Sequence, residues 1–210
     1  MKFLISRFNL KFLRNLVLLV CVSGLKLSSL QAYTNDQERR EARVQATYLT
    51  HLINFTTWSK QHLPPANQSP TILVLGNEKN GFVASLDYLI SQTQVRIEGK
   101  IAKFLHLNNT KVSEARAKLK RGVQVVFLMP GAKITPKEVR SSSPSAVVFG
   151  FGRDFVMKTG GDVAFVSQKN RVKLVLSEIY FRRTSPKLSS KIANLKSVVE
   201  IVRKTRPKSP

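Results

Sequence analysis

Short runs of consecutive apolar residues alternate along the middle of this chain with stretches in which apolar residues recur every three or four positions. A continuous apolar run is typical of a strand buried on both faces of a sheet, whereas the wider spacing is typical of an amphipathic helix. The runs predict strands at Thr71–Gly76, at Ile97–Leu107 with a break at Gly99-Lys100, at Val123–Met129 and at Ala146–Phe149. The wider spacing predicts helices at Phe82–Ser91, at Ser113–Lys120 with Ser113 as cap, and at Thr135–Ser142 with Pro136 in the first turn.

The two flanks of this region follow other patterns. Asp36–Trp58 predicts a helix, because apolar residues recur at helical spacing at Val44, Tyr48, Leu52, Phe55 and Trp58. Asp162–Ser167 and Arg171–Leu176 alternate between apolar and polar residues, which is the pattern of a β-hairpin. Beyond Pro186, a last amphipathic helix is predicted from apolar residues at positions 188, 192, 195, 198, 199 and 202.

Strands that alternate with helices, followed by a hairpin, are typical of an α/β fold. We therefore expect a mostly parallel central sheet with helices on both faces, and a C-terminal β-hairpin followed by a helix. Residues 33–204 are expected to form one domain. The polar residues 205–210 contain nothing that could enter a core, so a disordered tail is expected there.

The N-terminal residues 1–32 have the organisation of a secretory signal. Four basic residues up to Arg14 precede an apolar stretch from Leu16 to Leu25, and Ala32 supplies a small residue at a cleavage position. The apolar stretch is shorter than the roughly 20 residues of a membrane span. We expect export to the periplasm and cleavage after Ala32, with an uncleaved anchor as the alternative.

The charge balance points toward an anionic partner. Lys and Arg together number 35 against 12 Asp and Glu, which gives a net charge of +23. The cations are spread along the chain, so a solvated basic surface is the alternative explanation. The single cysteine, Cys21, lies in the signal segment, which excludes disulfides, a thiol nucleophile and cysteine-bound zinc in the exported part.

No motif for catalysis, a cofactor or a metal stands out. His51, His62 and His106 are not at the spacing of metal ligands, and no nucleophile elbow or phosphate loop occurs. Gly150-Phe-Gly-Arg-Asp154 is explained by turn geometry, and Gly160-Gly161-Asp162 by the start of a hairpin strand. Aromatic residues do lie near cations after position 150, but the exported address makes nucleic acid an improbable partner. The sequence thus indicates a protein that is not an enzyme and needs no cofactor.

Several segments, in order, resemble the YfiR family of periplasmic proteins, which includes HmsC-like regulators. The stretch Thr47–Trp58 keeps the Tyr, Leu, Phe and Trp of the family's first helix at Tyr48, Leu49, Phe55 and Trp58. Gly160-Gly161-Asp-Val-Ala-Phe165 and the segments 171–176 and 188–195 resemble the family's hairpin and the helix that follows it. The resemblance covers about residues 42–202. Ser177 replaces an Asn that is usual in the family, and the cysteines that some members pair are missing.

The resemblance implies a function. Better-understood members are dimeric periplasmic inhibitors that bind the periplasmic part of a membrane diguanylate cyclase and keep cyclic-di-GMP, and hence biofilm, low. An outer-membrane lipoprotein can sequester them. For this chain the resemblance implies the same kind of partner, a homodimer, and a possible lipoprotein partner. A small-ligand sensor using the crevice near Gly76, Gly131 and Gly150–Gly152, or a basic anion-binding envelope protein, are the alternatives.

Two groups of residues are singled out. Structural roles are predicted for Tyr48, Phe55, Trp58, Gly160, Gly161 and Phe165. A partner-binding role is predicted for Phe151, Arg153 and Phe155, because the segment after the strand Ala146–Phe149 is too rich in glycine for a regular element and combines aromatic rings with an arginine. The alternative is that Phe151 and Phe155 close the core while Arg153 points to solvent.

Export can be tested directly. Because the charged segment, the apolar stretch and Ala32 together match a signal, N-terminal sequencing of the protein from cells should begin near Tyr33. A soluble cytosolic protein that retains Met1 would contradict both the export and the function inferred from it.

Overall fold

The computed structural model describes residues 36–168 and 171–203. The predicted signal and tail therefore lie outside the described residues. The chain divides into two units, residues 1–40 and residues 41–210. Residues 36–54 are helical. Of these, residues 36–40 are the described part of the first unit, and residues 41–54, which we call the leading helix, open the second.

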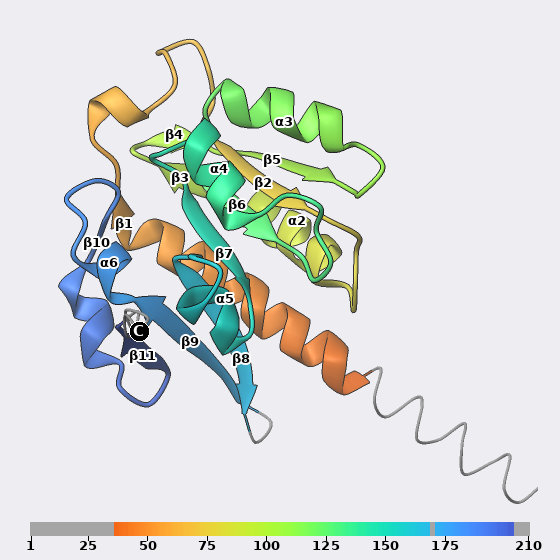
Figure 1. Ribbon diagram of the computed structural model, residues 1–210, viewed down its shortest axis with the longest axis vertical. Helices are drawn as coiled ribbons and strands as arrows, with labels where there is room; N and C mark the ends of the chain where they lie inside the picture. Colours follow the sequence, from red (N-terminus) through yellow and green to blue (C-terminus); the bar gives the residue numbers. More distant parts are fainter. Residues whose placement is uncertain (1–35, 169–170, 204–210) are drawn as a thin grey trace, which may run out of the picture. The chain divides into compact units, whose positions relative to one another are not determined.

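The second unit is built on a seven-stranded sheet in the order β11-β9-β8-β7-β6-β2-β5 (Figure 1). From one edge the strands are β5 (Lys103–Leu107), β2 (Thr71–Leu75), β6 (Val125–Leu128), β7 (Val147–Phe151), β8 (Val163–Gln168), β9 (Arg171–Ser177) and β11 (Val199–Val202). The first five run parallel, β9 returns antiparallel to β8, and β11 runs parallel to β9. The expected mostly parallel α/β sheet is confirmed.

Helices cover both faces of this sheet. The leading helix and α2 (Phe82–Thr93) share one apolar cluster with one set of strand side chains, while α3 (Val112–Lys120) and α4 (Pro136–Ser142) share another with the alternate set. The short helix α5 (Arg153–Met157) lies over β8 and β9 on the second face (Figure 1). Such two-sided burial explains why the strands are continuous apolar runs.

Smaller elements complete the unit. They are β1 (Thr56–Thr57), η1 (Lys60–His62), β3 (Arg96–Ile97), β4 (Lys100–Ile101), α6 (Glu178–Phe181), β10 (Lys187–Leu188) and η2 (Ser190–Asn194). The break expected at Gly99 is the turn of the β3–β4 hairpin, where Glu98 and Gly99 both have positive φ. Pro136 lies in the first turn of α4, as expected, and Thr135 is its cap, but α3 begins at Val112, so Ser113 lies inside its first turn and not at its cap.

The first predicted helix was drawn too long, and two of its residues were misplaced. The helix ends at residue 54, because Thr56 and Thr57 pair with Leu188 and Lys187 in a short antiparallel ladder. The buried residues of the leading helix are Ala42, Gln45, Ala46, Leu49, Thr50, Leu52 and Ile53. Val44 and Phe55 are instead 40% and 39% exposed.

The predicted C-terminal helix is wrong. The segment forms β10, a 3-10 turn and β11, and Leu195 is exposed. Two physical causes favour this outcome. The residues Val198, Val199, Ile201 and Val202 are β-branched and pack well in a sheet, and β9 offers a free edge with which β11 pairs over four residues.

Gly150 and Gly161 are glycines because an aromatic ring lies against them. The ring of Phe155, from α5, covers both residues, and a Cβ at either position would overlap with it. Neither position has positive φ, so close packing is the constraint. Gly152 and Gly160 differ, since their φ values of 79° and 84° themselves require glycine.

This packing gives a prediction. Gly161→Ala should destabilise the protein by about 1–3 kcal/mol, because its new methyl group has no room beside Phe155. Phe155→Leu should cost about 1 kcal/mol or more on its own, but it shortens the offending side chain. The double variant should therefore lose less stability than the two single losses added together, measured by urea unfolding. Strict additivity would contradict the close contact.

Candidate functional site

The strand ends that often hold a ligand in α/β folds are occupied here by the chain's own loops. Ligands bind such sheets where the connections diverge, which here is beside β2 at the carboxyl ends of the strands. The Asn109 side chain donates to the Gly131 carbonyl at 3.0 Å and accepts from the Lys133 N–H at 3.3 Å. His106 Nε2 donates to the Gly76 carbonyl at 2.8 Å, and Met129 packs tightly on Gly76. These contacts close the crevice expected near Gly76 and Gly131.

A smaller hollow of about 270 Å³ remains along the same edge, toward β7 and α5. The segment from Leu128 to Pro136 forms most of its wall, and its other lining residues are Phe151, Phe155 and Thr159. The two threonine hydroxyls that line it are engaged within the chain: Thr135 caps α4, and Thr159 donates to the Phe155 carbonyl. The hollow is therefore suited to an apolar group.

The segment predicted to bind a partner is regular, contrary to expectation. Gly150 and Phe151 are the last residues of β7, and Arg153 to Met157 form α5. Both phenylalanines contact the core, and they do so on opposite faces of the sheet. Phe151 packs against Phe82, Phe127 and Phe165, whereas Phe155 packs in the clusters of the other face. The separation arises because Phe151 is the last residue of β7, whereas Phe155 belongs to α5, which covers the other face of the sheet.

Of the three predicted partner-binding residues, Arg153 is the one at the surface. Its guanidinium forms a two-pronged ion pair with the Glu200 carboxylate of β11, at 2.6 and 2.7 Å, and the two side chains are about half exposed. Hydrogen bonding to Glu200 raises the pKa of Arg153, and the same bond holds the pKa of Glu200 below its ordinary value. An exposed pair of this kind adds little stability, because water screens it.

The six residues predicted to be structural lie in different surroundings. Trp58 is buried, and its backbone N–H donates to the Glu98 carboxylate at 2.8 Å. Phe165 is buried beside Phe127, Tyr48 is partly buried against the same cluster, and Phe55 is partly exposed. Gly160 and Gly161 form the turn before β8.

Asp162, directly after that turn, is a buried charge. Its side chain is 1% exposed, and one carboxylate oxygen accepts from Arg140 at 2.8 Å and from Arg183 at 2.9 Å. The other oxygen accepts from the backbone N–H of Val148 at 2.9 Å. Asp162 thus joins α4, β7, β8 and the segment after α6. A buried carboxylate needs such partners, because an unpaired buried charge is very costly.

Arg183 extends this network to Tyr180. The guanidinium carbon lies 5.7 Å from the centre of the Tyr180 ring, within the range of a cation–π contact. Burial lowers the pKa of Arg183 and raises the pKa of Tyr180. The Tyr180 hydroxyl bonds with Thr56, whose own hydrogen goes to the Leu52 carbonyl. The network therefore reaches the end of the leading helix.

A serine–histidine cluster is the arrangement among the described residues that most resembles a nucleophile with its base. His62 Nδ1 lies 3.0 Å from the Ser59 hydroxyl oxygen and 2.9 Å from that of Ser185. Both hydroxyls meet the same ring nitrogen, and no described carboxylate contacts the ring to orient it. In hydrolases the base is oriented by a third group at its other nitrogen. The cluster instead connects η1 to the loop before β10.

The described residues contain neither a cluster of metal ligands nor a membrane-spanning helix. No group of three or more His, Cys, Asp or Glu side chains in residues 36–168 and 171–203 is arranged to hold a metal ion. Within the same residues, no helix has both the length and the apolar character needed to cross a bilayer.

The comparisons with known proteins identify the family. A family model described as YfiR/HmsC-like matches residues 42–196, which is most of the chain. The chain belongs to the YfiR/HmsC-like family. A comparison with individually curated proteins gave no match. YfiR/HmsC-like proteins are periplasmic and regulatory, in agreement with the resemblance seen in the sequence.

Sequence reasoning missed the residues that surround Asp162. An acid directly before an apolar strand was a signal that the carboxylate could be buried, but Arg140 and Arg183 lie far from it in the sequence. The Arg153–Glu200 pair was missed for the same reason, since its partners are separated by 47 positions. Nothing in local spacing could identify these partners.

The buried network can be tested with a matched pair of substitutions. Asp162→Asn should lower the free energy of unfolding by about 3 kcal/mol, because it leaves two arginines without their charged partner. Asp154→Asn makes the same chemical change in an exposed pair with Lys158, so it should alter stability by less than about 1 kcal/mol. Urea unfolding measures both. Equal effects of the two substitutions would show that Asp162 is not a buried structural charge.

Proposed function

We propose that this protein is an exported periplasmic regulator that binds the periplasmic part of a membrane diguanylate cyclase and represses it. Repression would keep cyclic-di-GMP, and with it biofilm formation, low. The observation that carries the proposal is the family match over residues 42–196, which spans nearly all of the described second unit. The proposed exported form is a single domain, residues 33–204. A homodimer and an outer-membrane lipoprotein as a further partner belong to the same proposal.

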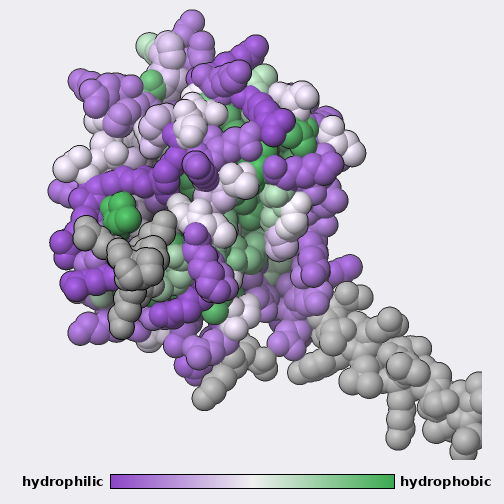
Figure 2. Space-filling model, viewed as in Figure 1, coloured by the Kyte–Doolittle hydropathy of each residue, from purple (hydrophilic) through white to green (hydrophobic). Residues whose placement is uncertain are grey.

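The charge distribution supports a partner with an acidic surface. Among the described residues from Glu41 to Glu200, every acid except Asp87 and Glu114 has a hydrogen bond or ion pair within the chain. Most lysines and arginines therefore have no acid left to pair with. Hydrophilic residues cover most of the face seen in Figure 2. Complementary charge of this kind speeds association and weakens as salt is added.

The proposed docking region lies around α5. The apolar hollow is on the β6 side of this helix, and the Arg153–Glu200 pair is on its β11 side. An apolar side chain of the partner fits the hollow, while an acidic side chain can compete with Glu200 for Arg153. Because Glu200 is itself half exposed, the exchange costs little desolvation. Phe151 and Phe155 then act as the floor of the hollow, and Arg153 is the direct contact.

Arg153 provides the test. Arg153→Glu should weaken repression of the cyclase by tenfold or more, on the order of 1.4 kcal/mol in binding. The measurement is intracellular cyclic-di-GMP in a strain that lacks the chromosomal gene and expresses each variant at equal level. Deletion of the gene should raise cyclic-di-GMP; an unchanged level in the deletion strain would contradict the proposed function itself.

Two charge exchanges separate partner contact from internal pairing. The double variant Arg153→Glu with Glu200→Arg restores the internal ion pair but leaves no cation at position 153. It should therefore repress as poorly as Arg153→Glu alone. Lys158→Glu with Asp154→Lys exchanges the other exposed pair of α5 and should repress normally. Recovery of repression in the first exchange would show that Arg153 acts only through Glu200.

A further inference from the structure

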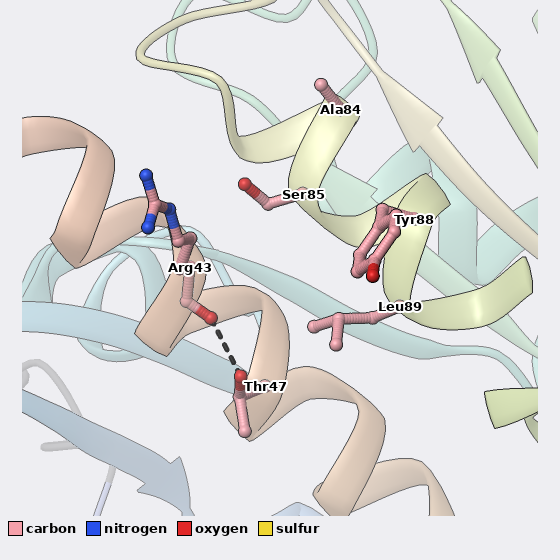
Figure 3. Close-up of a pocket in the computed structure, with 6 residues that line it drawn as sticks. All are labelled: Arg43, Thr47, Ala84, Ser85, Tyr88 and Leu89. Carbon is pink, nitrogen blue, oxygen red and sulfur yellow. Dashed lines mark hydrogen bonds between the residues drawn. The ribbon is translucent and has the colours of Figure 1, made fainter. Parts of the chain in front are cut away.

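A second, larger hollow lies on the other helical layer, between the leading helix and α2 (Figure 3). Its volume is about 540 Å³, within the range of small-molecule sites. Two residues of the leading helix and four of α2 line it: Arg43, Thr47, Ala84, Ser85, Tyr88 and Leu89. In the close-up, Ser85, Tyr88 and Leu89 of α2 lie toward Arg43 and Thr47 of the leading helix, while the Ala84 methyl points away from them at the rim.

The hollow exists because the facing side chains are short. The large apolar residues of each helix point toward the sheet, such as Leu49 and Ile53 on one helix and Phe82 and Leu86 on the other. The positions that face the neighbouring helix carry Thr47 and Ser85 instead. Short side chains cannot fill the gap between two helix surfaces, so the space follows from the sequence of both helices.

Arg43 is the source of polar recognition in this hollow. It is exposed and forms no ion pair among the described residues. The Thr47 hydroxyl donates its hydrogen to the Arg43 carbonyl at 2.9 Å, and the Ser85 hydroxyl donates to the Gly81 carbonyl at 2.7 Å. Both hydroxyls have thereby used their only hydrogen. The guanidinium remains as a free donor whose planar fork matches a carboxylate.

The remaining lining is apolar and contains an unusually exposed ring. Tyr88 is 65% exposed although it lies in the middle of α2, and Leu89 beside it is partly buried against the core. Val44, next to Arg43 in the leading helix, is 40% exposed. A ring, an aliphatic floor and one unpaired arginine are the contacts that an amphipathic anion requires.

We propose that this hollow binds a small organic carboxylate with a flat apolar body. The carboxylate pairs with Arg43, and the body lies against Tyr88 and Leu89. The lining contains one charged side chain, that of Arg43, and no second cation. This composition fits a monoanion and not a polyphosphate. This site is separate from the docking region around α5, because it is formed by the helices on the opposite face of the sheet.

Three probes test the chemistry on the purified protein by isothermal titration calorimetry. Phenylacetate carries both features, phenylacetamide is the uncharged compound of the same shape, and acetate has the charge alone. Saturable binding of phenylacetate is expected, with affinity at least about tenfold higher than that of either of the other two. Absence of saturable phenylacetate binding, or equal binding of the amide, would overturn the proposal.

Variants locate the site. Arg43→Gln should weaken phenylacetate binding about tenfold while leaving the amide unaffected, and Ser85→Leu should abolish binding by filling the hollow between the two helices. Thermal unfolding checks that both variants fold. Arg121→Gln is the matched control, because Arg121 is an exposed arginine at the end of α3 on the other face. If Arg121→Gln weakens binding as much as Arg43→Gln does, the affinity reflects net charge and the assigned site is wrong.

Discussion

The carboxylate of Asp162 must be neutralised inside the protein, and much of the architecture follows from how this is done. One oxygen receives two arginines and the other receives a backbone N–H of β7. The arginines come from α4 on one side and from the segment after α6 on the other, so these elements have to meet beside the start of β8. Tyr180 and Thr56 carry the connection to the end of the leading helix. A buried charge with this many partners is a poor source of net stability but a strong constraint on geometry.

The ring of Phe155 imposes a second constraint, on the glycines of β7 and of the turn that precedes Asp162. It lies on Gly150 of β7 and Gly161 of the turn before β8. That contact holds α5 against the sheet and leaves Arg153 on the outer side of the helix, within reach of Glu200. The packing of the Phe155 ring on the sheet therefore positions the proposed docking region around α5. The segment Gly160-Gly161-Asp162 therefore meets three separate constraints. Gly160 has positive φ, Gly161 lies under the ring of Phe155, and the carboxylate of Asp162 is buried.

Closure of the usual strand-end crevice affects where any ligand can bind. Asn109, His106 and Met129 tie together the loops that follow β2, β5 and β6. The larger hollow lies instead between the leading helix and α2, on a helical layer. A protein of this kind would use two faces: the α5 side for a regulatory partner and the paired helices for a small anion. Most of its acidic side chains bond within the chain, so the surface that the regulatory partner and the small anion would meet is basic.

Sequence alone determined the elements whose burial is visible in local pattern. The strands β2, β6 and β7, the hairpin β8–β9 and the helices α2, α3 and α4 were predicted because apolar runs and helical spacing are local signals. The family was also recognisable from ordered motifs. Tertiary structure decided the rest. Residues 199–202 became a strand because β9 had a free edge, and the leading helix stopped before Thr56 because β10 was there to pair with it. The partners of Asp162 and Arg153, and the hollow beside Arg43, depend on residues brought together from distant positions, and no local pattern encodes such contacts.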